Sequence, residues 1–467
     1  MEPRSEAEDR RGEQAPTSGR DKAPALVLLR RESLIDEPPS LRFVGGTPGQ
    51  TARIRASSVD SVGVIYESWA EYEVASSATI DPARQRPRAG TYKGVDPFGL
   101  WWSMASAAGR PFTRDLRPIA TTVTAEIDSR VVAQIQLDRL RVAPDVITRP
   151  VRTEDLVATL FLPGTSGPFP GVVVLGGSEG GIAQAEGLSA LLASHGFAAL
   201  ALAYFAMEGL PPQLAEIPLE YLETAARWLL RRPEVSPHGL GMMGTSRGAE
   251  LALLFASVCP EVRAVVGFAA SSVIWPGYTP GAPRARPAWT RGGVPFPFAL
   301  PVPGPSARLG GPGPFAQESL FLNGLQDQRR VAEAEIAVER IQGPVMLISG
   351  ADDRMWPSHL LGELAMRRLS GAERRGRDRH LTYPGAGHAV GRAPGLPAAA
   401  TTIVDQRNGM SHVLGGSRAG NARSARHSWP RVLAFLAEHL APSARRRRAP
   451  RRRAPSRTSG APRTSCP

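Results

Sequence analysis

A serine between two glycines, in Gly244-Thr245-Ser246-Arg247-Gly248, has surroundings that could make it a nucleophile. An apolar stretch precedes it and a helix-forming stretch follows it, which is the pattern of a strand that turns sharply into a helix. Residues 244 and 248 must be small, because side chains two positions before and after the serine would collide with the turn. A chain with 48 glycines also produces such patterns by chance. Catalysis therefore requires a base and an acid elsewhere in the chain.

Two later loops supply these groups. A nucleophilic serine needs a base to take its hydroxyl proton and an acid to orient that base. Asp353 follows the apolar stretch 345–349, and His388 follows a short strand in a glycine-rich loop. The order serine, acid, histidine is the one expected when the triad is built on alternating strands and helices. Asp352 is the alternative acid. We prefer Asp353 because, in folds that carry such a triad on alternating strands and helices, the acid usually stands third after the glycine, which is Gly350 here.

The tetrahedral intermediate also needs backbone N–H groups directed at its negative oxygen. Gly177 and Ser178 lie in a glycine-rich loop after an apolar strand, where either N–H could be one donor. The second donor is the N–H of Arg247, directly after the serine. The loop lacks the Gly-Lys-Ser/Thr sequence and the glycine spacing of a nucleotide-binding loop. We predict Ser246, Asp353 and His388 as the catalytic residues, with no cofactor and no metal.

Two patterns divide the chain into parts that could position these groups. Between residues 40 and 142, apolar and polar residues alternate over short runs such as 52–56. We therefore predict a small antiparallel β-sandwich over residues 39–146. After it, strands and helices alternate, which predicts a doubly wound α/β domain over residues 147–441 with a closing helix at 429–440.

Two segments of the chain allow two interpretations each. Residues 90–104 are unusually aromatic, which indicates either a packing plug between the domains or a contact with substrate. Residues 275–317 are dense in proline and glycine, so they should form no core element. They are either a loop that covers the carboxyl edge of the sheet or a disordered insert.

We predict that both ends of the chain, residues 1–38 and 442–467, are disordered. The net charge of +13 would be compatible with binding to nucleic acid. However, nine arginines and no acids lie in 442–467, so the rest of the chain carries only about +4. A solvated tail is thus favoured over a polyanion-binding arm. Two cysteines in different surroundings and the lack of an apolar leader or membrane span predict a cytoplasmic protein. The sequence does not indicate an oligomeric state.

Several stretches together resemble one known family, the acyl-CoA thioesterases that share their fold with the bile-acid-CoA:amino acid N-acyltransferases. The resemblance covers about residues 35–440. It depends on Gly99-Leu100-Trp101-Trp102-Ser103-Met104 and on residues 175–181, 204–221, 244–253, 350–357 and 386–388. It implies an α/β-hydrolase catalytic domain preceded by a β-sandwich, an acyl-CoA substrate, and Ser246, Asp353 and His388 as the triad.

The resemblance implies thioester hydrolysis through an acyl-enzyme, releasing a fatty acid and CoA. In the amino-acid-conjugating branch of this family the nucleophile is a cysteine, so the serine favours transfer to water. Three alternatives stay open: an amino acid N-acyltransferase, a carboxylesterase or dienelactone hydrolase on the same fold, and a binding protein that acts through its arginine-rich tail.

Overall fold

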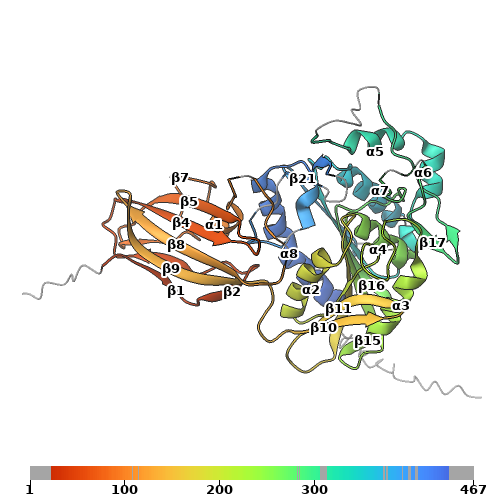
Figure 1. Cartoon of the computed structure of the whole chain (residues 1–467), viewed down its shortest axis with the longest axis horizontal. Helices are drawn as coiled ribbons and strands as arrows, with labels where there is room; N and C mark the ends of the chain where they lie inside the picture. Colours follow the sequence, from red (N-terminus) through yellow and green to blue (C-terminus); the bar gives the residue numbers. More distant parts are fainter. Residues whose placement is uncertain are drawn as a thin grey trace, which may run out of the picture.

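The computed structural model describes residues 23–440 apart from 108, 114, 281, 283, 305–312, 372–373, 375–376, 392, 398–400 and 405–408. An amino-terminal part built of strands lies beside a larger part in which helices cover a sheet (Figure 1). The arginine-rich segment 442–467 lies outside the described residues, so its predicted disorder stays a prediction.

The amino-terminal part consists of two sheets. One has the strand order β2-β9-β8-β4-β5-β7 and the other the order β1-β3-β6. Their strands are β1 (Ala25–Leu28), β2 (Glu32–Leu34), β3 (Leu41–Val44), β4 (Thr51–Val59), β5 (Ile65–Glu73), β6 (Thr79–Ile80), β7 (Ala89–Gly90), β8 (Ile119–Ile127) and β9 (Arg130–Leu140). In β4 every second residue is buried, as the alternation in the sequence predicts. Strands β8 and β9 follow one another along the chain and form an antiparallel pair.

The prediction of disorder for residues 1–38 is wrong for the segment that contains β1 and β2. Strand β1 pairs with β3, and β2 pairs with β9. Both strands are only three or four residues long, and Leu26 is their one buried residue. Such short strands carry almost no periodic signal, and the partner of β2 lies far along the chain. Residues 1–22 lie outside the described residues.

The larger part is built on an eight-stranded sheet of order β10-β11-β13-β12-β15-β16-β19-β20. The pairs β10–β11 and β11–β13 are antiparallel, and all later pairs in this order are parallel. The strands are β10 (Ile147–Thr153), β11 (Leu156–Leu162), β12 (Phe169–Leu175), β13 (Ala198–Leu202), β15 (Val235–Thr245), β16 (Val262–Phe268), β19 (Val345–Gly350) and β20 (Arg379–Tyr383). The sequence did not indicate β10, because this edge strand is mostly exposed and contains charged residues and a proline.

Helices cover both faces of this sheet. The helices on one face are α2 (Ala183–Ser194) and α8 (Arg418–Leu440), and those on the other are α3 (Leu219–Leu230), α4 (Arg247–Val258) and α7 (Ser358–Ser370). Alternate residues of β12 show this division: Val172 and Val174 pack with the α2 and α8 side, and Val173 and Leu175 with the α3 and α4 side. The closing helix begins at Arg418, well before the predicted residue 429, because its first half is too rich in arginine to look amphipathic.

The remaining elements lie outside these three sheets. They are α1 (Gly99–Trp102), β14 (Ile217–Pro218), β17 (Trp289–Arg291), β18 (Val294–Pro295), α5 (Glu318–Gly324), α6 (Gln328–Ala334), the 3-10 helices Val338–Arg340 and His388–Gly391, β21 (Thr402–Val404) and β22 (Ser411–Val413). The described residues of 275–317 are not a disordered insert, since β17 and β18 form a small sheet with β14. Two side chains of this segment, Trp275 and Trp289, are nevertheless fully buried in the core.

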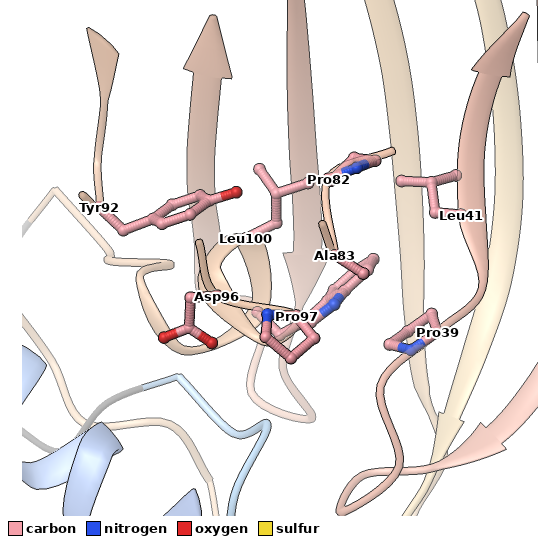
Figure 2. A pocket seen from close by; sticks show the side chains of 9 residues that line it. Pro39, Leu41, Pro82, Ala83, Tyr92, Asp96, Pro97 and Leu100 are labelled. Atoms are coloured by element: carbon pink, nitrogen blue, oxygen red, sulfur yellow. The ribbon is translucent and has the colours of Figure 1, made fainter. Parts of the chain in front are cut away.

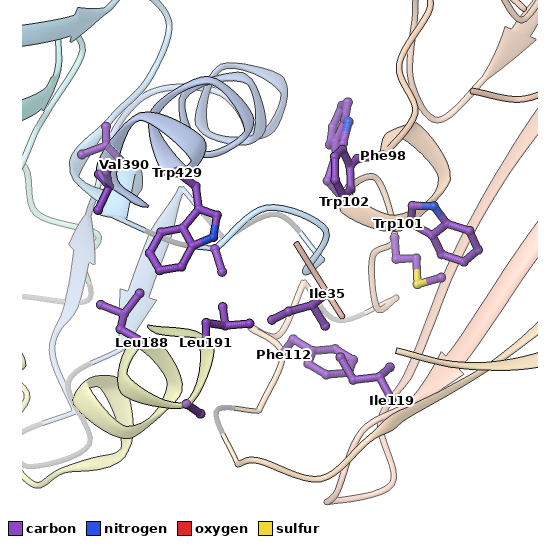
Figure 3. Packing of buried hydrophobic residues seen from close by; sticks show 14 of the residues in the cluster. Ile35, Phe98, Trp101, Trp102, Phe112, Ile119, Leu188, Leu191, Val390 and Trp429 are labelled. Carbon is purple, nitrogen blue, oxygen red and sulfur yellow. The ribbon is translucent and has the colours of Figure 1, made fainter. Parts of the chain in front are cut away.

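Apolar side chains join the two parts of the molecule. Figure 3 shows Trp102 and Ile35 on one side and Trp429, Leu188 and Leu191 on the other, and all five belong to one buried cluster. This packing supports the interpretation of residues 90–104 as a plug between the parts. Within the amino-terminal part, Tyr92, Asp96 and Leu100 of the same stretch also line a small pocket (Figure 2).

Candidate active site

The chain turns sharply at Ser246, between the end of β15 at Thr245 and the start of α4 at Arg247. Ser246 has φ 54° and ψ −119°, a conformation that a residue with a Cβ rarely adopts. Such strain is found where surrounding structure enforces it, often at functional sites. A Cβ at Gly244 would overlap the Gly248 carbonyl oxygen, and a Cβ at Gly248 would overlap the carbonyl oxygen of Gly176. The two glycines therefore meet the steric requirement that the sequence predicted.

The three predicted side chains lie within hydrogen-bonding distance of one another. His388 Nε2 is 2.9 Å from Ser246 Oγ, and His388 Nδ1 is 2.8 Å from Asp353 Oδ2. Their exposed fractions are low: 7% for Ser246, 1% for Asp353 and 11% for the His388 side chain. Asp352, the alternative acid, is exposed. The arrangement has the geometry of a nucleophile, a base and an orienting acid.

The loop that carries Asp353 also orients the histidine ring. Asp353 Oδ1 accepts hydrogen bonds from the N–H groups of Met355 and Trp356, at 2.9 and 3.3 Å. The Trp356 ring packs edge-on against His388 with 5.8 Å between centroids, and its Nε1–H donates to the Ala269 carbonyl at 3.0 Å. Both the acid and the ring it orients are thus held by one turn at the end of β19.

The loop after β12 runs beside the serine. A Cβ on Gly177 would lie 3.5 Å from Ser246 Cβ, so this loop is in contact with the nucleophile. The Gly177 N–H donates to Gln184 Oε1 at 2.9 Å, and the Tyr204 hydroxyl donates to the Gly176 carbonyl at 2.8 Å. No described residue accepts a hydrogen bond from the N–H of Ser178 or of Arg247. Of the two alternatives in the loop, Ser178 is therefore the one whose N–H is available to a ligand.

A buried ion pair lies behind the nucleophile. Arg247 donates to Glu250 Oε2 at 3.1 Å and to the Trp275 carbonyl at 2.9 Å, and Trp289 Nε1–H donates to Glu250 Oε1 at 2.7 Å. Burial raises the pKa of Glu250 to about 7, although the charge of Arg247 acts in the opposite direction. The Arg247–Glu250 pair therefore connects the start of α4 to the segment that contains Trp275 and Trp289.

Our sequence reasoning missed Glu250, Tyr204 and Gln184. A glutamate in the otherwise apolar stretch 249–256, four residues after the serine, was an available signal, because a charge on a buried helix needs a partner. Tyr204 directly follows an apolar strand, a position where side chains reach the carboxyl edge of a parallel sheet. Gln184 gave no signal of its own.

Within the described part of the chain, no cluster of three or more histidine, cysteine, aspartate or glutamate residues is arranged to hold a metal ion. Over the same residues, no helix is both long enough and apolar enough to cross a membrane.

The strand order, the sharp turn at the serine and the helices on both faces define a protein of the α/β-hydrolase class. Comparison with family profiles identifies the family within this class. Residues 36–153 match the acyl-CoA thioester hydrolase/BAAT N-terminal region, and residues 217–286 and 311–442 match the BAAT/acyl-CoA thioester hydrolase C-terminal region. The chain belongs to this family.

Some relatives named as thioesterases and others named as amino acid N-acyltransferases are similar to this chain over most of its length. A peroxisomal succinyl-coenzyme A thioesterase of Mus musculus is 30% identical, over 87% of this chain and 94% of its own. Acyl-coenzyme A amino acid N-acyltransferase 1 of Mus musculus is 31% identical, over 89% and 97%. Among solved structures, a putative dienelactone hydrolase from Klebsiella pneumoniae is 19% identical with a TM-score of 0.39, covering 63% of this chain and 97% of that one.

Proposed function

We propose that this protein hydrolyses acyl-CoA thioesters through an acyl-enzyme formed on Ser246. The observation that carries the proposal is the chain of hydrogen bonds from Ser246 Oγ to His388 and from His388 to Asp353, at 2.9 and 2.8 Å. Membership of the acyl-CoA thioester hydrolase/BAAT family supports the substrate class. The thioester hydrolases among the relatives support an enzyme of the same kind.

In the proposed mechanism His388 takes the hydroxyl proton of Ser246 while the serine oxygen attacks the thioester carbonyl. The N–H groups of Arg247 and Ser178 hold the resulting oxyanion. When the carbon–sulfur bond breaks, CoA leaves with the proton that His388 carried. The same histidine then takes a proton from water, the hydroxide attacks the acyl-enzyme, and the proton returns to Ser246 as the fatty acid departs.

Transfer to an amino acid is the second candidate, because several of the similar relatives are named amino acid N-acyltransferases. Both reactions share the acyl-enzyme and differ only in whether water or an amine attacks it. A serine nucleophile favours water as the acceptor, since the nucleophile is a cysteine in the amino-acid-conjugating branch of the family that this chain resembles. Adding glycine or taurine to the assay distinguishes the two, because an acyltransferase would give an amide in place of the free acid.

We test the proposal by replacing Ser246 with alanine and assaying a panel of acyl-CoAs and p-nitrophenyl esters. The expected result is loss of thioester hydrolysis with an unchanged melting temperature, because only the nucleophilic oxygen is removed. Hydrolysis of acyl-CoA at the wild-type rate by the variant would contradict the assignment of Ser246. Wild-type protein that cleaves esters but no acyl-CoA would instead favour a carboxylesterase.

We also infer that the sandwich domain begins at β1, not at the predicted residue 39, and covers residues 25–146, because β1 and β2 pair within its two sheets. Residues 147–441 form the catalytic domain. The buried side chains of both amino-terminal sheets, such as Phe43 and Ile54, belong to one cluster, which supports a sandwich. A cytoplasmic location stays a prediction, since the relatives include a protein named as peroxisomal and one named as mitochondrial.

A further inference from the structure

We infer that Tyr204 and Gln184 are positioning residues that fix the orientation of the peptide carrying the Ser178 N–H, the first donor of the oxyanion hole. This inference deepens the proposed function and depends on it. Neither residue belongs to the triad, and neither is within the glycine-rich loop. Each acts through hydrogen bonds to the backbone of Gly176 and Gly177.

Tyr204 determines which way the peptide carbonyls of the loop point. Its hydroxyl lies 2.8 Å from the Gly176 carbonyl oxygen and 3.3 Å from that of Gly177. In a trans peptide the carbonyl and the N–H point in opposite directions. Because the Gly177 carbonyl is directed at Tyr204, the N–H of the same peptide, which belongs to Ser178, is directed away from Tyr204. Gly177 itself lies against the Ser246 Cβ.

Gln184 determines the orientation of the preceding peptide. Its side-chain oxygen accepts the Gly177 N–H at 2.9 Å, from the first turn of α2. That N–H is therefore engaged and cannot also serve the oxyanion. The Gly176–Gly177 peptide is held at both ends, with its carbonyl on Tyr204 and its N–H on Gln184. Only the next peptide remains to offer an N–H to the substrate.

The tyrosine is itself rigid. It is almost fully buried, its ring packs against Phe205 and Trp289 with centroids 5.1 and 6.1 Å apart, and the Phe205 carbonyl accepts the Gly181 N–H at 3.2 Å. Burial raises the pKa of Tyr204 far above its usual value, so the hydroxyl stays protonated and remains a donor. The segment after β13 thus acts as a fixed support for the whole loop.

The test compares Tyr204→Phe and Gln184→Met with a matched control, Tyr221→Phe. Methionine keeps the length of the side chain but removes the acceptor. The Tyr221 hydroxyl also donates to a backbone carbonyl, that of Ala203 at 2.8 Å, but does not contact the glycine-rich loop. It therefore shows how far the loss of a tyrosine hydroxyl that does not contact the loop changes the same measured quantities.

Three quantities are measured for each variant: kcat, the Kd of a non-hydrolysable S-alkyl-CoA thioether, and the Ki of an acyl-CoA analogue with a trifluoromethyl ketone. The ketone forms a tetrahedral adduct with an oxyanion, and the thioether does not. Tyr204→Phe and Gln184→Met should lower kcat about 10- to 100-fold and raise the ketone Ki by a similar factor. The thioether Kd should stay within about twofold, and Tyr221→Phe should behave like the wild type.

The inference is overturned if kcat is unchanged in Tyr204→Phe and Gln184→Met. It is also overturned if the thioether and the ketone lose affinity equally, because a general loss of structure would affect both. The same variants are assayed with a p-nitrophenyl ester. A wild type that cleaves the ester but not the thioester would refute the proposed substrate. The role of Tyr204 and Gln184 would then be decided by the kcat of their variants with the ester.

Discussion

The residues of the site have two different roles: three side chains would carry the reaction, and Tyr204 and Gln184 hold the backbone beside them. Ser246, Asp353 and His388 could be selected from their types, their order and the strands before them, and the structure brings their side chains together. Tyr204 and Gln184 act on backbone groups of the loop after β12, and they lie 28 and 7 residues further along the chain than the glycines they contact. Their roles depend on which carbonyl or N–H lies opposite them, and spacing along the chain does not encode that.

The choice between two adjacent acids can be tested directly. Asp353→Asn should lower kcat by about 10⁴-fold, because the amide cannot hold His388 in the tautomer that accepts the serine proton. Asp352→Asn is the control and should leave kcat unchanged, since this side chain is exposed. Steady-state hydrolysis of one acyl-CoA by both variants checks the prediction. A larger loss in the Asp352 variant would reverse the assignment of the acid.

The buried pair of Arg247 and Glu250 should stabilise the fold only while both partners are present. Glu250→Leu leaves the guanidinium buried without a counter-charge and should lower the free energy of unfolding by about 3–5 kcal/mol. The double variant Arg247→Met/Glu250→Leu should recover most of this loss, because no uncompensated charge remains. Urea unfolding of the three proteins measures the effect. A double variant no more stable than Glu250→Leu would show that the two charges are not coupled.

The elements that position the site are the strand β15, the helix α4 and the loop after β12, which approach closely at glycines. The sequence predicted the strands and helices here because their apolar runs are long and bounded by glycine and proline. It did not indicate β1, β2 and β10, which are short or largely polar. It also did not reveal that the tryptophans of 275–317 pack into the core, because proline-rich segments carry no periodic pattern.

Two glycine substitutions test whether the close approach of these elements at a glycine is required for activity. Gly248→Ala places a methyl group on the Gly176 carbonyl oxygen, so it should displace the loop or the helix and lower kcat at least about 100-fold. Gly187→Ala, within α2, meets open space and should raise the free energy of unfolding by about 0.4–1 kcal/mol with kcat unchanged. Activity and thermal unfolding of both variants are measured. Normal activity in Gly248→Ala would mean that the close approach is not required.

In the whole molecule, the two parts are held together by apolar packing and by a few polar contacts. Asp36 Oδ2, from the amino-terminal part, lies 2.6 Å from His195 Nε2 at the end of α2 and accepts the Trp429 Nε1–H of α8 at 2.7 Å. The same junction contains the ion pair between Arg426 and Asp96, at 2.6 Å. These contacts join segments more than 150 residues apart, which is why no local pattern predicted them.

The Asp36–His195 contact should make stability depend on pH. The hydrogen bond to Asp36 raises the pKa of His195 above its ordinary value of 6.5, and the nearby Glu37 acts in the same direction. A raised pKa in the folded state contributes stability that is complete below pH 6.5 and is lost as the pH rises through the folded pKa. The difference in melting temperature between wild type and His195→Gln should therefore shrink as the pH rises from 6 to 9. A difference that grows over this range would contradict the assignment.

The central claim is that a thioester becomes an ester on Ser246, and mass spectrometry of the protein tests it most directly. The enzyme is mixed with an acyl-CoA, quenched in acid within milliseconds, digested and analysed. We predict that the acyl mass appears on the peptide that contains Ser246, while CoA is released in a burst, and that both signals are absent in Ser246→Ala. An acyl group on another residue, or CoA release at the wild-type rate without Ser246, would contradict the account.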